Sequence, residues 1–522
     1  MRTRDRGDPS LIHKAFRSSA GKLFWDVVAR VLGFLVSVFI ARRLGAAGYG
    51  HYAVLWYLAW MTAQITDLGL HLVVLRNLSR EGALDLAGEG AHKAAKGPRP
   101  ARLLVAGAIA SKGALTVASL ASATLAAAWS VGTSVHFPSL ALLYAASLIA
   151  SWTELFGVVL RSQGRLGLEG AVLGLVRAGW LVGAVVALER GGGLLEIGLA
   201  LTLGSLPGLV LAGALAYRQL GFRWGLASME SLSMAAGARA LLRQTAPLAL
   251  TSIITLAYLR LDVLLLAWLR GAEAAGLFAA SFRLFEALFL FSGAIVSGAF
   301  PLIAARVGQR GLEGLSAFVV RLLLWTAFPA TVGFTVLAEP IIGLLYGPGY
   351  ALSAGPLRVL AAGIVAVYIN ALTSHLLVAT GRGRALVTVM AVRLTVALGL
   401  DLALIPALGP VGAAAAVVAA EWSLTVVSLA CTRQILRPSA VLKEGLVPGA
   451  CALAAAAAML VPAGPVPLRI ALGGLVYGAA FLTSWLVAAI GKGPLRSATR
   501  HLFEARGGIT EPPLEGGRNG RS

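Results

Sequence analysis

The chain contains little charge for its size. Only 13% of its 522 residues are Asp, Glu, Lys or Arg, about half the share found in a soluble domain. Apolar residues make up 58% of the chain, and the mean hydropathy is +0.82. Because a water-soluble core could not hide this much apolar surface, lipid must be the solvent around most of the chain.

Cysteine and acidic residues are also scarce. The two cysteines, Cys431 and Cys451, lie at or inside apolar segments, so we predict neither a disulfide framework nor a metal site. Lys and Arg outnumber Asp and Glu by 44 to 23. They lie in short loops and form no basic domain, which argues against a nucleic-acid partner and indicates topology signals instead. No catalytic triad pattern or phosphate loop occurs, so we predict no enzyme and no cofactor.

Long apolar segments follow one another along the whole sequence. A bilayer crossing needs about 20 apolar residues. With that length as the criterion, we predict an all-α polytopic membrane protein with about fourteen transmembrane helices. The predicted spans lie near 23–41, 48–74, 103–129, 138–160, 168–188, 194–216, 245–269, 276–303, 318–338, 356–379, 385–406, 410–431, 445–462 and 468–490.

The loop charges predict the orientation of these spans. If the N-terminus is cytoplasmic, most loop Lys and Arg residues fall on the cytoplasmic side, whereas the outer loops 130–137, 339–355 and 407–409 contain none. Arg42, Arg190 and a few others are exceptions. The pattern follows the positive-inside rule and predicts two cytoplasmic termini.

Two short echoes indicate an internal repeat. A shift of 226 residues carries Gly45 and Gly50 onto Gly271 and Gly276. A second echo pairs two triplets, Leu160, Gly164 and Arg165 with Leu377, Gly381 and Arg382. Since six spans separate the copies, we expect two six-helix lobes related by a pseudo-twofold axis along the membrane normal, with a cleft between them. The predicted parts are a basic cytoplasmic N-terminus (1–22), two lobes (23–217 and 244–433), a cytoplasmic linker (218–243), two extra helices (434–490) and a polar cytoplasmic tail (491–522).

The first hairpin resembles a known family. The stretch ARRLGAAGYGHYAVL, followed by TDLGL and VLRNLSRE, is similar to the N-terminal signature of bacterial polysaccharide-biosynthesis flippases. These belong to the multidrug/oligosaccharidyl-lipid/polysaccharide (MOP) exporter superfamily, and the resemblance extends over roughly residues 15–435. It implies a protein of the bacterial inner membrane that moves an undecaprenyl-diphosphate-linked oligosaccharide to the outer leaflet. The implied partners are that lipid, membrane lipids and the polymerase and glycosyltransferases of polysaccharide assembly.

Arginines inside the predicted spans suggest an anion site. Charges within apolar spans usually face a bundle interior or a wet cavity. A diphosphate is dianionic, and guanidinium groups match phosphate oxygens in a bidentate manner. We therefore expect Arg30, Arg260 and Arg283 to face the cleft and bind the diphosphate, with Arg177 and Arg393 as further candidates.

Carboxylates in the spans raise the question of ion coupling. Asp26 and Asp262 are the candidates for a proton or sodium site. The alternative is local pairing: Asp26 lies four residues from Arg30, and Glu286 lies three residues from Arg283, so each pair shares a helix face. Arg260 and Asp262 are two residues apart and each need another partner.

Three other functions stay open at this level. The segment RVLGF at Arg30 resembles the first span of lipid II flippases, which also suit fourteen spans. A cation-coupled multidrug exporter of the same superfamily would usually have twelve spans and an acidic cleft. A membrane scaffold of a polysaccharide assembly complex is the alternative from a different class.

Overall fold

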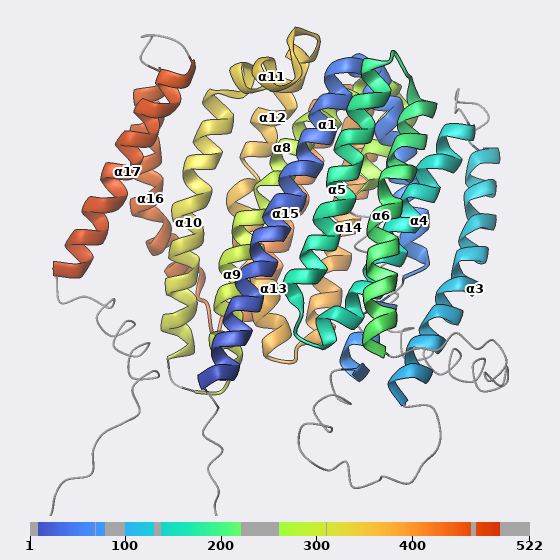
Figure 1. The fold of residues 1–522 in the computed structure, drawn as a ribbon. Helices are drawn as coiled ribbons and strands as arrows, with labels where there is room; N and C mark the ends of the chain where they lie inside the picture. The colour runs from blue at the N-terminus through green and yellow to red at the C-terminus, as the bar shows by residue number, and fades with distance from the viewer. Residues whose placement is uncertain are drawn as a thin grey trace, which may run out of the picture.

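The computed structural model describes residues 9–67, 69–71, 73–78, 100–129, 137–220, 260–309, 311–460 and 466–490 (Figure 1). The helices labelled here are α1 (Pro9–Ile65), α3 (Pro100–Trp129), α4 (Phe137–Ser162), α5 (Leu166–Glu189), α6 (Leu194–Leu220), α8 (Ala272–Ala287), α9 (Phe289–Ala305), α10 (Leu312–Val336), α11 (Ala338–Tyr346), the 3-10 helix η2 (Pro348–Ser353), α12 (Ala354–Ala361), α13 (Ile364–Ala379), α14 (Gly383–Leu408), α15 (Pro410–Thr432), α16 (Pro438–Leu460) and α17 (Val466–Ile490). Residues 260–270 are also helical. No strand occurs within these ranges, which confirms the all-α prediction.

The predicted spans correspond to helices. Nine helices of the described part are long and apolar enough to cross a membrane, or ten if the pair Pro348–Ala361 and Ile364–Ala379, bent by 47°, forms one span. One of the nine, Phe24–Ile65, is 42 residues long and contains two predicted spans. The helices α3 and α17 contribute shorter apolar stretches, and most of the predicted span 245–269 lies outside the described residues. The chain is therefore a multi-pass, all-helical membrane protein.

Glycine reverses the chain at the first hairpin. Gly45 has φ 68° and ψ 177° and divides α1 into two helices; Figure 1 shows the chain turning back at this point. Gly271, its partner in the predicted repeat, has φ 87° and ψ 171°. Residues with a Cβ rarely adopt such positive φ angles, so both turns depend on glycine. We call the end of the bundle that carries these two turns the Gly45 end.

The second echo is also a matched pair of turns. The amide of Arg165 donates to the carbonyl of Leu160 at 3.0 Å, and the amide of Arg382 donates to that of Leu377 at 2.9 Å. The intervening glycines have φ angles of 72° and 70°. Both are the six-to-one hydrogen bond of a Schellman turn, which ends one helix and starts the next. The two echoes therefore mark structurally equivalent turns.

The two copies of the first hairpin pack directly against each other. A Cβ added to Gly50 would lie 1.7 Å from the carbonyl oxygen of Ala272, and one added to Gly276 would lie 2.0 Å from that of Ala46. The shift of 226 relates Ala46 to Ala272 and Gly50 to Gly276, so the contact is reciprocal. A reciprocal contact is the signature of a twofold interface. The pseudo-twofold axis therefore passes between α1 and α8, and we call this contact the glycine clasp.

The remaining helices pack within two groups. In the first group, α1, α4, α5 and α6 contact one another; in the second, α8 to α10 and α12 to α15 do so. Small residues allow close approach inside each group, as where Gly179 of α5 lies against Gly204 of α6. The linker predicted at 218–243 lies almost wholly outside the described residues, and the tail predicted at 491–522 lies outside them entirely. Those boundaries stay predictions.

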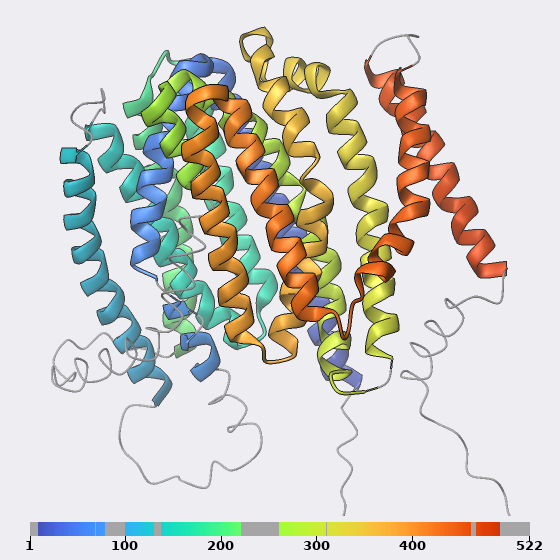
Figure 2. The same ribbon diagram turned by 180° about the vertical axis from the view of Figure 1, so that it is seen from behind.

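The helices α16 and α17 stand outside the repeat. They lie at one edge of the molecule in both views (Figures 1 and 2) and pack on α10. Tyr477 donates from its hydroxyl to the carbonyl of Trp325 at 2.9 Å, and the two rings meet edge to face at 5.4 Å. The helices α16 and α17 are therefore an addition to the second lobe and take no part in the glycine clasp.

Candidate substrate-binding site

Helix α8 places Arg283 and Glu286 one turn apart, so both reach the same space. Arg283 Nη1 donates to Glu286 Oε2 at 3.1 Å, as the spacing of three residues predicted. The other carboxylate oxygen accepts from Arg260 Nη2 at 2.7 Å. Glu286 thus joins two guanidinium groups from two helices. Arg260 finds its partner in α8 rather than in its sequence neighbour Asp262.

Arg260 is held by aromatic rings as well as by Glu286. Its guanidinium carbon lies 4.5 Å from the ring centre of Tyr57 and 5.8 Å from that of Phe282. The side chain is buried, and its Nε and Nη1 atoms find no hydrogen-bond acceptor among the described residues. Cation–π contacts offset part of the cost of removing such a charge from water. Arg260 therefore acts as a fixed positive charge that orients Glu286.

Arg283 and Arg177 meet at α1 from opposite lobes. Arg283 Nη2 donates to the carbonyl of Gly33 at 3.2 Å. A Cβ at Gly33 would lie 3.8 Å from that nitrogen and 3.9 Å from Arg177 Cδ, so both arginine side chains lie against the same position of α1. The guanidinium of Arg177 stacks on Trp180 at 4.0 Å. Within the described part of the chain no ion pair of Arg177 occurs, although Glu154 interacts with it electrostatically. We call Arg177, Arg260 and Arg283 the arginine cluster.

Arg30 lies on the face of α1 that points to this cluster. Lys22, Asp26, Arg30, Gly33 and Ser37 recur every three or four residues and so share one face. The exposed large apolar residues Phe24, Val27, Val31 and Leu35 follow a second stripe. Lipid contact suits the apolar stripe, whereas Arg30 lies on the stripe that includes Gly33, next to Arg283 and Arg177.

Asp26 does not form an ion pair with Arg30. Its ion pair in the structure is with Lys22, at 3.8 Å. Lys22 Nζ also donates to Glu169 Oε2 of α5 at 3.2 Å. Among the described residues no ion pair of Arg30 occurs. Lys22 lies four residues before Asp26 and Arg30 lies four residues after it, so either could pair with Asp26. The contact of Lys22 with Glu169 of α5 holds Lys22 near Asp26.

Comparison with known families assigns the chain. A family model described as "Polysaccharide biosynthesis protein" matches residues 23–306, which is more than half of the sequence and includes all three helices of the arginine cluster. The chain belongs to the polysaccharide biosynthesis protein family. It is a transporter of the MOP superfamily, as the first hairpin predicted. No curated protein sequence matches it at a significant level.

Solved structures share the fold of this family member at low identity. One is described as "Lipid II flippase MurJ, inward closed conformation"; it is 13% identical, with a TM-score of 0.69, and the match covers 91% of this chain and 99% of that one. A multidrug resistance MATE family transporter of the MOP superfamily in an inward-facing conformation is 16% identical, with a TM-score of 0.60 and coverages of 80% and 96%. A MOP superfamily transporter from Pyrococcus furiosus is 15% identical, with a TM-score of 0.57 and coverages of 85% and 100%. These likenesses establish the shared fold.

Arg393 lies apart from the arginine cluster of this polysaccharide biosynthesis protein. Its Nη2 donates to Glu421 of α15, a nearly inaccessible carboxylate. Asn370 Nδ2 donates to the other oxygen of Glu421 at 2.9 Å, and Thr425 donates to Asn370 Oδ1 at 2.9 Å. Sequence position relates Arg393 to Arg177, but the two arginines have different surroundings. Arg393 belongs to a polar network that ties α13, α14 and α15 together.

We expect replacement of Arg393 by methionine to reduce stability and to leave substrate affinity unchanged. Glu421 would lose one partner but keep Asn370, so the cost is about 1–3 kcal/mol in free energy of unfolding. Thermal unfolding in detergent and binding of a lipid-linked substrate measure the two effects separately. A drop in affinity at unchanged stability would instead place Arg393 in the substrate site.

Two buried carboxylates lie behind the arginine cluster. Asp262 accepts a hydrogen bond from the Val263 amide at 2.8 Å. Asp401 of α14 interacts with it electrostatically, and its Oδ1 is buried with no hydrogen-bond donor among the described residues. Asp401 was not predicted as a site residue. Its signal in the sequence was a carboxylate in the middle of the predicted span 385–406.

Sequence reasoning also missed a buried ionic network in the first lobe. Lys112 of α3 is fully inaccessible, and its Nζ donates to Asp67 Oδ1 at 2.9 Å and to Ser151 Oγ at 2.8 Å. His71 pairs with the other oxygen of Asp67. The signal was present, because a lysine inside an Ala-rich span requires a carboxylate partner.

Proposed function

We propose that the chain flips undecaprenyl-diphosphate-linked oligosaccharide, the repeat unit of an O-antigen, capsule or exopolysaccharide, across the bacterial inner membrane. The observation that carries the proposal is the arginine cluster at the boundary between the lobes. Arg177 comes from the first lobe and Arg283 from the second, and both lie against Gly33. Relative movement of the lobes would change the contacts of a ligand bound to both arginines. Alternating access requires this coupling between ligand binding and lobe movement.

The charge balance of the cluster suits a dianion. Among the described residues, Glu286 pairs with both Arg260 and Arg283, and neither Arg30 nor Arg177 forms an ion pair. Guanidinium groups without an ion pair can bind an anion, and a diphosphate diester carries two negative charges. Charge-assisted hydrogen bonds from guanidinium to phosphate are roughly twice as strong as neutral ones. Arg30, Arg177 and Arg283 are accessible enough to bind the diphosphate, whereas Arg260 supports Glu286 from behind.

The arginine cluster argues against a multidrug exporter of cations. A cationic substrate would meet Arg177 and Arg283 at the lobe boundary, and like charges in a cleft of reduced dielectric repel strongly. A lipid II flippase is the second candidate, because lipid II also carries a diphosphate and one structure with this fold bears that name. A scaffold role in polysaccharide assembly, beside a polymerase and glycosyltransferases, needs no such cluster.

Orientation and coupling complete the proposal. By the positive-inside rule the Gly45 end faces the periplasm, and both termini lie in the cytoplasm. In this orientation the glycine clasp holds the two lobes together on the periplasmic side. Of the two ion-coupling candidates, Asp262 with its neighbour Asp401 fits a cation or proton site better than Asp26, which is paired with Lys22.

Transport in proteoliposomes tests the proposal. We expect Arg177→Ala and Arg283→Ala to weaken binding of fluorescently labelled undecaprenyl-diphosphate-linked oligosaccharide about 10- to 100-fold, the loss of one or more charge-assisted hydrogen bonds. Transport should fall in step. Arg358→Ala is the matched control, because Arg358 forms only an exposed ion pair with Glu339 at 2.8 Å.

Each alternative gives a different result. Lipid II transported faster than the oligosaccharide lipid would favour the lipid II flippase. No transport by the purified wild-type protein, with either lipid, would favour a scaffold. Undiminished transport in both cluster variants at normal folding would exclude the arginine cluster as the diphosphate site.

A further inference from the structure

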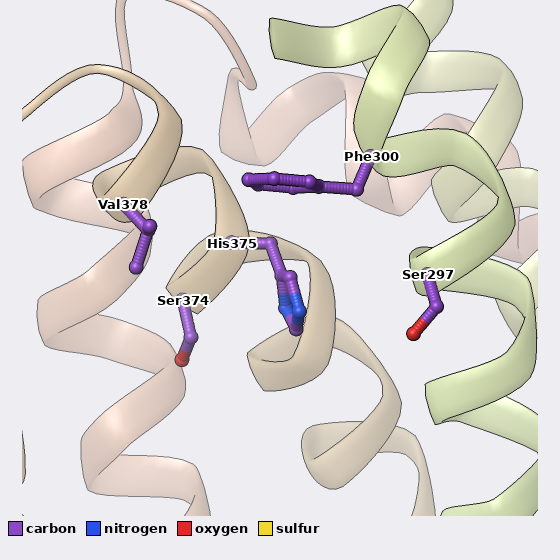
Figure 3. A pocket seen from close by; sticks show the side chains of 5 residues that line it. All are labelled: Ser297, Phe300, Ser374, His375 and Val378. Carbon is purple, nitrogen blue, oxygen red and sulfur yellow. The ribbon is translucent and has the colours of Figure 1, made fainter. Parts of the chain in front are cut away.

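A cavity of about 380 Å³ opens between α9 and α13, away from the arginine cluster. Its lining consists of Ser297 and Phe300 from α9 and Ser374, His375 and Val378 from α13 (Figure 3). The volume lies at the lower end of the range of about 300–1,000 Å³ that is typical of ligand pockets. It has room for a mono- or disaccharide.

The two serines in this cavity keep their hydroxyl groups available. Ser and Thr side chains in membrane helices usually donate to the carbonyl three or four residues earlier. Ser292, on the same helix, does so with Phe289 at 3.2 Å, and Thr373, beside Ser374, does so with Ile369 at 3.2 Å. Neither Ser297 nor Ser374 forms a hydrogen bond within the described ranges. Two hydroxyl donors therefore remain free to bind a ligand.

His375 adds an acceptor between these donors. Its Nδ1 lies 2.7 Å from the carbonyl oxygen of Ala371. A carbonyl can only accept, so Nδ1 carries the proton, and in the neutral ring Nε2 is left as an acceptor. Figure 3 shows the imidazole between the two hydroxyl groups, with the ring of Phe300 beside it; the ring centres are 5.5 Å apart.

The lining excludes several classes of ligand. No Lys, Arg, Asp or Glu lines the cavity, so neither a phosphate nor a cation would find a charge partner. An acyl chain that filled the cavity would cover the two hydroxyls and Nε2 without giving them hydrogen bonds, at a cost for each group. A neutral molecule with many hydroxyl groups and an apolar C–H face satisfies both the polar atoms and the aromatic ring. Sugars have this chemistry.

We propose that the α9–α13 cavity is a glycan subsite, which binds one or two sugars of the lipid-linked substrate. The inference rests on the proposed function and extends it from the diphosphate to the sugar chain. Ser297 and Ser374 donate to sugar oxygens, His375 Nε2 accepts from a sugar hydroxyl, and Phe300 packs on the C–H face. Glu286 and Ser297 are eleven residues apart along a nearly continuous helical run, about 16 Å at 1.5 Å per residue. The sugars bound here are therefore several units away from the diphosphate.

Binding with and without the glycan tests this assignment. The probes are lipid-linked oligosaccharides extracted from membranes of the bacterium that encodes the chain, and undecaprenyl diphosphate, which carries no sugar. We expect His375→Ala and Ser297→Ala each to weaken binding of the glycan-bearing lipid up to about tenfold, the loss of one hydrogen bond. Binding of the bare undecaprenyl diphosphate should not change. Arg283→Gln should weaken the binding of both probes.

Controls separate a folding defect from lost recognition. Ser292→Ala removes a hydroxyl from α9 outside the cavity and should not change the binding of either probe. His375→Gln keeps a polar side chain and replaces His375→Ala if that variant does not fold. Equal effects of His375 and Ser297 variants on both probes, or no effect on either, would overturn the glycan subsite while leaving the arginine cluster intact. Wild-type protein that binds neither probe would overturn the proposed function and the subsite with it.

Discussion

Replacement of Glu286 by alanine is expected to destabilise the protein by about 3–5 kcal/mol, the usual cost of breaking a buried ion pair from one side. Glu286 is the carboxylate that balances Arg260, whose side chain is only 8% exposed. Two nitrogens of Arg260 already find no acceptor among the described residues. Without Glu286 the guanidinium of Arg260 would stay buried, and its cation–π contacts with aromatic rings would be the interactions left to stabilise its charge.

Thermal unfolding in detergent measures this effect. Glu273→Ala is the matched control, because Glu273 lies in the first turn of the same helix, is exposed and forms no ion pair within the described part. A double variant, Arg260→Met with Glu286→Leu, should recover much of the stability, since apolar replacement of a buried pair is often neutral. If the single Glu286 variant melted as the wild type does, the joining role of Glu286 would be wrong.

The double variant also separates stability from function. It removes the charges of Arg260 and Glu286 but leaves Arg177 and Arg283 in place. Arg283 would then lose the carboxylate that holds its Nη1 at 3.1 Å, while the contact to Gly33 persists. We therefore expect restored folding with weakened substrate binding, because an arginine that is no longer oriented loses more rotamer freedom when it binds.

Features set by local chemistry could be predicted from the sequence. Span positions follow from segment length and apolar composition, which depend on neighbouring residues alone. The turns at Gly45 and Gly271 were recognisable because positive φ angles select glycine. The second echo marked the positions of the turns at Gly164 and Gly381, but their Schellman hydrogen bonds came from the structure. The shift of 226 residues then predicted a twofold relation between the two hairpins. The reciprocal contacts of the glycine clasp agree with this relation.

Features set by packing between helices could not be predicted. Spacing along one helix suggested Arg30 as a partner of Asp26, whereas the position of α5 favours Lys22. Arg260 and Glu286 are 26 residues apart, so no helical spacing rule relates them. Their pairing depends on how the helix of residues 260–270 lies beside α8. Partner choice is a tertiary property, and single-helix patterns do not contain it.

The two predicted equivalents Arg177 and Arg393 show the same limit. The repeat places them at nearly corresponding positions, offset by one residue, yet Arg393 meets Glu421 and Arg177 meets Trp180. Pseudo-symmetry conserves the backbone turn but not the side chains that surround it. As a result one arginine became part of a structural network, and the other remained available at the lobe boundary.

Replacement of Gly276 by alanine is expected to open the Gly45 end and to abolish most transport. The new methyl group would lie 2.0 Å from the carbonyl oxygen of Ala46, a backbone atom that cannot rotate away. Overpacking of this kind costs about 1–3 kcal/mol. Applied to the closed state alone, that cost changes the ratio of closed to open molecules about 5- to 150-fold. A transporter that cannot close one side stops cycling.

Labelling of a buried cysteine measures the opening. The only two cysteines, Cys431 and Cys451, are first replaced by alanine, and Ser37→Cys then reports from the buried face of α1, where Ser37 bonds Tyr49 at 2.6 Å. A membrane-impermeant maleimide added at the Gly45 end should react faster in the Gly276→Ala background. Gly293→Ala on α9 is the control, because a Cβ there meets no atom within 4 Å. Unchanged labelling and normal transport in the Gly276 variant would show that the lobes do not separate at the glycine clasp. Faster labelling with lost transport would place the moving boundary at this contact between the two repeats.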